Sequence, residues 1–343
     1  MKNMHFRRKL PVPQQIKERY PLTSALAAVK AERDRRIADI FTGQSGRMAL
    51  IIGPCSADRE DAVLEYCTRL ASLQEAVEEK LVLIPRVYTN KPRTTGAGYK
   101  GLLHQPDPEA DSDLLEGVIA IRRLHIGVLA NTGLSTADEM LYPADYRYIS
   151  DLLSYAAVGA RSVENQEHRL TASGLGIPVG MKNPTSGDIS VMLNAIAAAQ
   201  MGHTFIYRGW EVETAGNGLA HAILRGYVNR HGESLPNYHF EDLEHLHTAY
   251  QARSLQNMAL IVDANHANSG KDPLQQRRIC KEVLHSCRHA PHLRSMVRGF
   301  MVESYLEPGC QAIGGGVYGK SITDPCLGWA DTERLVKELA ELI

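Results

Sequence analysis

One repeating unit constrains the fold of this chain more than any other feature of its sequence. From about residue 48, a strand-length apolar run is followed by a polar or glycine-containing loop and then by a longer segment with apolar residues three or four positions apart. The apolar runs lie at 48–54, 81–88, 127–130, 155–160, 178–181, somewhere between 203 and 224, at 259–263 and at 297–302. Helical periodicity occurs at 62–80, 114–124, 190–200, 240–252, 276–287 and 331–343.

Eight strands, each followed by a helix, predict a closed (β/α)8 barrel, also called a TIM barrel. An open, doubly wound sheet is the structural alternative for the same alternation. Residues 1–46 lie outside the repeat and contain one expected helix, 24–41, which ends near Gly43. We therefore expect an N-terminal extension at 1–46, involved in oligomerisation or regulation, and a catalytic barrel at 47–343. The extension is expected to pack outside the barrel or against another subunit.

A second departure from the repeat lies between Thr204 and Gly226. Two apolar runs in this region are separated by the turn-forming sequence AGNG at 215–218, which predicts a β-hairpin inserted near the sixth strand. The pattern leaves open which of the two runs belongs to the barrel.

Charge and composition restrict the partners of the chain. Its formal net charge is -1 and no long run of one sign occurs, which gives no reason to expect nucleic acid or an anionic membrane as a partner. The apolar runs have the length of strands, and the basic N-terminus leads into prolines instead of an apolar segment. We therefore expect a cytoplasmic protein. Its six cysteines are scattered, so free thiols are expected.

Residues that suit a metal ion follow the first and the last two predicted strands. The active site of a (β/α)8 barrel forms at the carboxyl ends of the strands. Cys55 follows the first strand, His266 the seventh and Glu303 the eighth, and closure makes these strands neighbours. Asp324 lies in the loop after the eighth strand. A thiolate, an imidazole and two carboxylates suit one divalent ion such as Mn, Fe, Co or Zn. Taken singly, each is also explained as a packing residue, a core histidine or a turn cap.

Cationic side chains form a second group at the same strand ends. They can supply charge-assisted hydrogen bonds to phosphate. Because the net charge of the chain is close to zero, a local cluster of cations indicates an anionic ligand. A single arginine or lysine is more often a solvated surface group. The group comprises Arg86, Lys91, Arg93, Arg161, Lys182 and Arg225, with Thr94 in the same KPRTT loop as Lys91.

Glu139 has two interpretations. It is a candidate active-site carboxylate after the third strand. The sequence TADE at 136–139 is also typical of a helix capping box, which explains the glutamate without chemistry. Both interpretations remain open at this point.

Together these segments resemble the class I alpha family of 3-deoxy-D-arabino-heptulosonate-7-phosphate (DAHP) synthases, the first enzymes of the shikimate pathway. The resemblance runs from about residue 47 to the C-terminus and is closer to the branch found in Gram-positive bacteria. It rests on IGPCS (52–56), RVYTNKPRTT (86–95), YKGL (99–102), TADEML (136–141), VGARSVENQEHR (158–169), GMKNPTSG (180–187), ILRG (223–226), DANHANSGK (263–271), GFMVESYL (299–306) and YGKSITDPCLGW (318–329).

The resemblance implies an enzyme that joins phosphoenolpyruvate to erythrose 4-phosphate and releases phosphate. It assigns one divalent metal to Cys55, His266, Glu303 and Asp324. It assigns phosphoenolpyruvate to Arg86, Lys91, Arg161, Lys182 and Arg225, with Gly159 and Ala160 beside Arg161 in the same motif, and erythrose 4-phosphate to Arg93 and Thr94. Lys91 is the candidate proton donor to the new alkoxide, and Glu139 and His266 complete the candidate catalytic group.

The resemblance also implies feedback inhibition by an aromatic amino acid, through the extension and the hairpin, and a homodimer or homotetramer. Three rival functions remain: a related synthase that makes 3-deoxy-octulosonate 8-phosphate, a Schiff-base aldolase using Lys182, and a non-catalytic sensor of phosphorylated metabolites. Cys326, close to Asp324 in sequence, is expected to lie near Cys55, so that oxidation to a disulfide would destroy the metal site.

Overall fold

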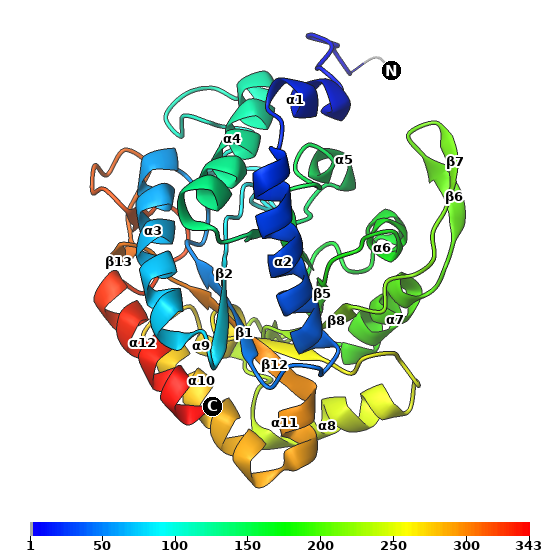
Figure 1. Cartoon of the computed structure of the whole chain (residues 1–343), viewed down its shortest axis with the longest axis vertical. Helices are drawn as coiled ribbons and strands as arrows, with labels where there is room; N and C mark the ends of the chain where they lie inside the picture. Colours follow the sequence, from blue (N-terminus) through cyan, green and yellow to red (C-terminus); the bar gives the residue numbers. More distant parts are fainter. Residues whose placement is uncertain (1–2) are drawn as a thin grey trace.

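Eight parallel strands form the centre of the molecule (Figure 1). The computed structural model describes residues 3–343. The strands are hydrogen-bonded in the order β2-β1-β12-β11-β8-β5-β4-β3. A parallel bridge between Arg86 and Ala137 joins the two outer members, β2 and β3, and closes the barrel. The strands are β1 (Met48–Gly53), β2 (Leu81–Pro85), β3 (Thr136–Glu139), β4 (Leu153–Val158), β5 (Val179–Lys182), β8 (Ala220–Leu224), β11 (Leu260–Asp263) and β12 (Val297–Glu303).

Helices surround this barrel, and the predicted (β/α)8 architecture is confirmed. Except for Glu139 and Arg298, every residue of the eight strands is buried, as expected of parallel strands covered on the outside by helices. No helix within residues 3–343 is long and apolar enough to cross a membrane. The helices are α3 (Glu60–Val77), α4 (Leu114–Thr132), α5 (Pro143–Tyr146), α6 (Gln166–Ser173), α7 (Ile189–Gln200), α8 (Phe240–Gln251), α9 (His266–Ser269), α10 (Gln275–His289), α11 (Pro291–Met296) and α12 (Trp329–Leu342).

The N-terminal extension closes the end of the barrel opposite the carboxyl ends of the strands. It contains α1 (Pro13–Arg19), which the sequence analysis did not anticipate, and α2 (Ser24–Phe41), which has the predicted bounds. Ile37, Ile40 and Phe41 of α2 belong to the same buried cluster as residues inside the barrel. The Arg33 guanidinium donates a hydrogen bond to the carbonyl of Leu83 on β2. Helix α2 therefore acts as a lid on the barrel core.

The prediction for the third strand was wrong. Residues 127–130 belong to α4, whose helical pattern continues to Thr132 and ends at Gly133 with a φ of 68°. The third strand is the more polar segment Thr136–Glu139. Its Asp138 accepts hydrogen bonds from the backbone and hydroxyl of Thr89, so a buried partner offsets the polarity of the strand. The capping-box interpretation of residues 136–139 is therefore also wrong.

The inserted hairpin exists, but its turn lies elsewhere than predicted. Strands β6 (Thr204–Tyr207) and β7 (Trp210–Glu213) pair antiparallel around Arg208 and Gly209, whose φ angles of 57° and 79° suit a tight turn. Residues 215–218 instead connect the hairpin to β8, which is the sixth barrel strand. Figure 1 shows the hairpin extending from the body of the molecule. Two further short pairs are β9 (Tyr227–Val228) with β10 (Ser234–Leu235), and β13 (Glu307–Cys310) with β14 (Lys320–Ser321).

Candidate active site

A cavity of about 250 Å³ lies among the loops that follow the barrel strands. Most of the side chains that the sequence indicated for substrate binding and catalysis line it. Thr94 is exposed and lies outside this lining. The predicted residues in the lining are Arg86, Lys91, Arg93, Glu139, Gly159, Ala160, Arg161, Lys182, Arg225, His266 and Asp324.

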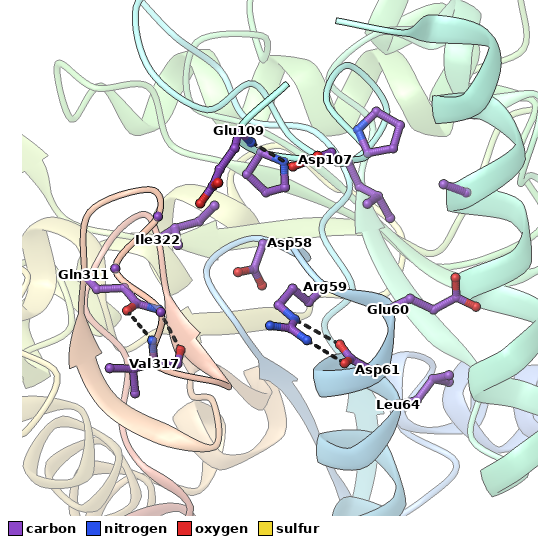
Figure 2. A pocket seen from close by; sticks show the side chains of 17 residues that line it. Asp58, Arg59, Glu60, Asp61, Leu64, Asp107, Glu109, Gln311, Val317 and Ile322 are labelled. Carbon is purple, nitrogen blue, oxygen red and sulfur yellow. Dashed lines mark hydrogen bonds and ion pairs between the residues drawn. The ribbon is translucent and has the colours of Figure 1, made fainter. Parts of the chain in front are cut away.

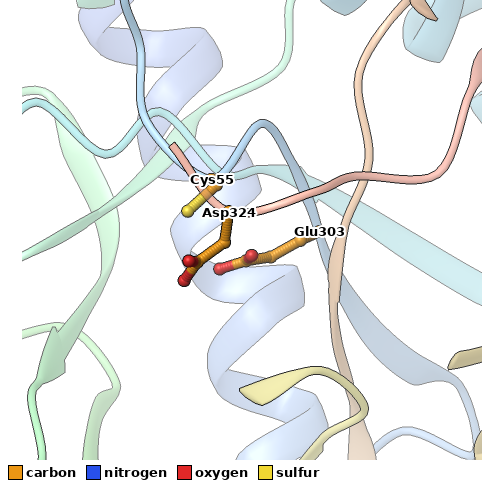
Figure 3. A group of neighbouring side chains, drawn as sticks. All are labelled: Cys55, Glu303 and Asp324. Atoms are coloured by element: carbon orange, nitrogen blue, oxygen red, sulfur yellow. The ribbon is translucent and has the colours of Figure 1, made fainter. Parts of the chain in front are cut away.

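Three of the four predicted metal ligands point toward one another at one edge of this cavity (Figure 3). Ligand atoms of Cys55, Glu303 and Asp324 all lie within 4.8 Å of one another. Cys55 follows β1, Glu303 is the last residue of β12, and Asp324 lies in the loop before α12. The fourth predicted ligand, His266, is not part of this group of mutually close atoms, but its Nε2 lies 3.8 Å from Oε1 of Glu303. Barrel closure thus brings together residues that are far apart in the sequence.

The donor set fits a divalent cation. Burial raises the pKa of the Cys55 thiol, and the carboxylates of Glu303 and Asp324 raise it further, against the opposing effect of Lys91. Two carboxylates and a thiol held this close in a buried place repel one another once ionised, and a bound cation relieves that repulsion. A sulfur, a nitrogen and carboxylate oxygens are ligands that Zn, Fe, Co and Mn accept.

Arg86 and Glu303 form a buried ion pair beneath the candidate metal site. Nη2 of Arg86 lies 2.9 Å from Oε1 of Glu303, and each side chain is only 1% exposed. The guanidinium also lies 3.7 Å from the centre of the Tyr88 ring. Burial would raise the pKa of Glu303, but Arg86, His266 and Lys91 outweigh it and lower the pKa. Glu303 is therefore kept ionised and available as a ligand.

Asp263, at the end of β11, connects the metal ligands to the cationic residues. Its Oδ2 lies 2.9 Å from Nδ1 of His266 and 3.2 Å from Nζ of Lys182. Burial alone would raise the pKa of Asp263, but His266 and Lys182 hold it far below its ordinary value. A carboxylate at Nδ1 orients a metal-binding imidazole so that Nε2 faces the metal. His266 itself has a φ of 50°, an uncommon backbone conformation that is often found at functional sites.

Cationic side chains make up much of the cavity lining. Within residues 3–343, no carboxylate oxygen lies within 4.0 Å of the guanidinium groups of Arg93, Arg161 or Arg225, while Lys182 contacts Asp263. Burial lowers the pKa of Arg225, and the Arg161 charge lowers it further, against the pull of Asp263. Such an excess of positive charge suits an anionic ligand with several oxygens.

Lys91 lies between the two groups. Its Nζ is 2.9 Å from Sγ of Cys55 and 3.1 Å from the Cys55 carbonyl oxygen. Burial would lower the pKa of Lys91, but Cys55 and Glu303 outweigh burial and raise it. The ammonium group is therefore protonated at neutral pH and can donate a proton into the cavity.

Glu139 and Gly159 come from adjacent strands and lie against each other. Glu139 ends β3 and faces the cavity, in agreement with its interpretation as an active-site carboxylate. A side chain at position 159 would displace the flexible Glu139 side chain, so glycine there leaves room for the Glu139 carboxylate. Ala160 and Arg161 follow and complete this part of the lining.

Comparison with known proteins identifies the family. The family model described as the DAHP synthetase I family matches residues 20–337. The chain belongs to the DAHP synthetase I family. A Trp-sensitive phospho-2-dehydro-3-deoxyheptonate aldolase of Escherichia coli O157:H7 is 38% identical over 342 residues, which cover 97% of this chain and 95% of that protein. The corresponding enzyme of Corynebacterium glutamicum is also 38% identical, over 98% of this chain and 92% of its own length.

A solved member of the family has the same architecture. The structure of phospho-2-dehydro-3-deoxyheptonate aldolase from Francisella tularensis SCHU S4 superposes with a TM-score of 0.92 at 30% identity, covering 99% of this chain and 98% of that one. The recognition made on sequence motifs, as a class I DAHP synthase, is thereby confirmed.

A larger cavity outside the candidate active site is unsuited to the phosphorylated substrates of a DAHP synthase (Figure 2). It measures about 790 Å³ and lies between the start of α3, the loop that contains Asp107 and Glu109, and a glycine-containing loop at 311–322. Carboxylates dominate its charged lining, and Arg59 is bound to Asp61. The sequence GGGVYGKS at 314–321 has the spacing of a phosphate-binding loop. Its last two residues form strand β14, and the next helix, α12, begins only at Trp329, so the loop lacks the required helix N-terminus.

Sequence reasoning did not single out several residues of the site. Asp263 and Lys271 both lie in the DANHANSGK motif, and Nζ of Lys271 is 2.9 Å from Oδ1 of Asp324. Asn265, from the same motif, donates a hydrogen bond to Glu303. Tyr88 places its ring against Arg86. Three of these residues lie in the DANHANSGK motif and Tyr88 lies in RVYTNKPRTT, so the motifs were a usable signal for all four, although they did not indicate that the Tyr88 ring packs against Arg86.

Proposed function

We propose that this chain condenses phosphoenolpyruvate with erythrose 4-phosphate to 3-deoxy-D-arabino-heptulosonate 7-phosphate and phosphate, the first step of the shikimate pathway. The observation that carries the proposal is the close approach of Cys55, Glu303 and Asp324 beside a cavity lined by Arg93, Arg161 and Arg225, which have no carboxylate partner within residues 3–343. Family membership supports the same reaction.

One divalent ion, Mn, Fe, Co or Zn, would be held by Cys55, His266, Glu303 and Asp324. When bound it supplies a Lewis acid for the aldehyde oxygen of erythrose 4-phosphate. The protein itself prepares this site, because Asp263 orients His266 and Arg86 keeps Glu303 ionised.

The cationic side chains of the cavity would bind the two substrates. Arg161, Lys182 and Arg225 would hold the phosphate and carboxylate of phosphoenolpyruvate, with Arg86 and Lys91 at the same end and Gly159 and Ala160 leaving room for it. Arg93 and Thr94 would take the phosphate of erythrose 4-phosphate, which requires the exposed Thr94 loop to move inward. Holding both anions in register would supply several of the roughly 7 to 11 kcal/mol available from proximity.

The chemistry would proceed by attack of C3 of phosphoenolpyruvate on the aldehyde carbon. Lys91 would give its proton to the alkoxide that forms, which fits its raised pKa. Water would then add at C2, with Glu139 as a candidate base to accept its proton. Cleavage of the C–O bond would release phosphate from the resulting hemiketal phosphate.

A two-substrate assay tests this proposal. Release of inorganic phosphate is measured with both substrates, after removal of metal with EDTA, and after addition of Mn²⁺. We expect no turnover after chelation and recovery with Mn²⁺. Full activity after thorough chelation would contradict the metal-dependent reaction. Turnover with arabinose 5-phosphate in place of erythrose 4-phosphate would favour the octulosonate synthase. Trapping of substrate on Lys182 by borohydride would favour a Schiff-base aldolase. Binding of both substrates without release of phosphate would favour a sensor.

We further propose that an aromatic amino acid inhibits the enzyme at the junction of the extension and the hairpin. The E. coli relative described above is named Trp-sensitive. A cavity of about 280 Å³ lies at this junction, and the Arg147 guanidinium lies 5.6 Å from the Tyr207 ring beside it. Its lining residues are Pro13, Gln14, Lys17, Tyr146, Arg147, Ser150, Leu175 and Tyr207. Assays with each aromatic amino acid test this, and unchanged activity with all three would contradict it.

A homodimer or homotetramer in the cytoplasm is proposed on the family resemblance alone. Sedimentation equilibrium of the purified full-length chain measures the assembly directly, and a monomer at micromolar concentration would contradict it.

A further inference from the structure

Two imidazoles converge on the outer surface of α10, away from the active site. Nε2 of His285 lies 3.1 Å from Nε2 of His289, one helical turn further along. Both side chains are exposed, whereas the residues on the opposite face of this helix, among them Val283 and Cys287, are buried. The pair is therefore accessible to solutes and plays no part in the core.

We propose that His285 and His289 form a second metal site, which takes a divalent ion with a preference for imidazole nitrogen, such as Zn²⁺, Ni²⁺ or Cu²⁺. Residues four apart on a helix lie on the same face, and two histidines with this spacing can bind one ion together. Two ring nitrogens already close to each other can both reach a common ion with little rearrangement. The remaining coordination positions would be filled by water.

The surroundings of the pair are compatible with a cation. His289 is the last residue of α10, and the unsatisfied carbonyl groups at a helix C-terminus favour positive charge. The neighbouring basic side chains are engaged elsewhere. Lys281 binds Glu338, and the Arg288 guanidinium donates to the carbonyl of Leu342.

A second pair of neighbouring imidazoles provides a contrast. The rings of His247 and His292 lie 4.7 Å apart, but Nε2 of His292 is 2.5 Å from Oε1 of Glu244. That nitrogen already has a carboxylate partner. At the α10 pair, by contrast, each Nε2 faces only the other imidazole among the contacts within the described residues. We therefore assign the site to His285 and His289.

The two metal sites of the chain would differ in selectivity. The barrel site offers a thiol and two carboxylates besides an imidazole, and carboxylates accept Mn²⁺ readily. The α10 site offers nitrogen alone, and the affinity of nitrogen ligands rises steeply from Mn²⁺ to Ni²⁺ and Cu²⁺. Zn²⁺ should therefore load both sites, whereas Mn²⁺ should load only the barrel.

Equilibrium dialysis of the full-length, chelator-treated protein against Zn²⁺ tests the proposal. We expect the parent protein to bind one equivalent more than the His289→Ala variant. Loss of the second of two linked ligands should weaken zinc binding at this place by about a hundredfold. The difference between the two proteins does not depend on how many ions the barrel binds, so it separates this proposal from that of the catalytic metal. With Mn²⁺ the two proteins should bind equally.

Two matched variants serve as controls. His231→Ala removes another exposed histidine, whose Nε2 accepts from the guanidinium of Arg230, and His292→Ala disrupts the other imidazole pair. Both should bind as much zinc as the parent. The electron paramagnetic resonance spectrum of the Cu²⁺-loaded parent should show coupling to two nitrogens, and His289→Ala should lose it. Equal zinc binding by parent and His289→Ala, or loss of the equivalent in His292→Ala instead, would overturn the assignment.

Discussion

Among single side chains, Asp263 has the largest expected influence on the active site. It contacts both His266 and Lys182, so replacement with asparagine removes the charge that orients a metal ligand and fixes a substrate-binding lysine. Loss of such a supporting contact typically lowers metal affinity by about 10- to 100-fold. We expect Asp263→Asn to show this loss in a Mn²⁺ titration of activity, together with a lower kcat. Asp111→Asn, at an exposed aspartate, is the control, and equal metal affinity in the two variants would refute the role of Asp263.

The buried carboxyl of Asp58 makes the stability of the protein depend on pH. Burial raises the pKa of its carboxyl to about 6, against the hydrogen bond from Tyr305. The folded protein therefore holds the Asp58 proton more tightly than the unfolded chain does. The contribution of this protonated carboxyl to the free energy of unfolding is complete below pH 3.8 and is lost as the pH rises through about 6.

Asp58→Asn should therefore stabilise the protein above pH 6 and change little near pH 4. The expected gain in the free energy of unfolding at pH 8 is about 2 to 3 kcal/mol. Denaturant titrations at the two pH values measure it. Asp61→Asn provides the opposite case, because hydrogen bonding to Arg59 lowers the pKa of that exposed carboxyl. A gain for Asp58→Asn that is the same at both pH values would contradict this assignment.

Among the elements, α2 has a structural task at the end of the barrel remote from the active site. Phe41 is 1% exposed, and its ring lies 4.2 Å from that of His221 inside the barrel. Phe41→Ala should lower the free energy of unfolding by about 3 to 5 kcal/mol, because it leaves a cavity in a closed core. KM for both substrates should stay unchanged. Val29→Ala, at a position of the same helix that is 40% exposed, should cost far less. A large change in KM without loss of stability would argue against a purely structural task.

The elements also show where a sequence pattern predicts structure well and where it does not. Strongly periodic segments such as α10 and α12 were predicted within about two residues of their observed bounds, because burial of one face imposes the period, and Gly43 indicated where α2 ends. The third strand was missed because its four residues are mostly polar, and Asp138 is tolerated only through hydrogen bonds from Thr89, which is distant in sequence. The hairpin turn was misplaced for a related reason, since Arg208 adopts a positive φ that its residue type does not suggest.

At the level of the whole molecule, closure of the barrel made the active site predictable. Once a closed barrel was inferred, Cys55 after β1, His266 after β11 and Glu303 at the end of β12 were expected to be neighbours, and Glu303 lies close to both of the others. Closure does not determine which buried charges pair. The contacts of Asp263 with His266 and of Arg86 with Glu303 depend on the side-chain conformations inside the finished barrel, so the sequence pattern could not reveal them.

Barrel closure also brings Cys55 and Cys326 together, so that oxidation could join them in a disulfide. The backbone nitrogen of Cys55 lies 3.4 Å from Sγ of Cys326, although 271 positions separate them in sequence. A disulfide between them would remove a metal ligand, so peroxide should inactivate the metal-free protein faster than the Mn²⁺-loaded one, in which the ion occupies the Cys55 sulfur. In the parent protein, dithiothreitol should restore the activity lost to peroxide. Cys326→Ser should slow the inactivation by peroxide, whereas Cys310→Ser, which removes an exposed thiol, should leave its rate unchanged. Peptide mapping after oxidation identifies the pair. If peroxide inactivates the Cys326→Ser protein as fast as the parent, the Cys55–Cys326 disulfide is not the cause of the inactivation.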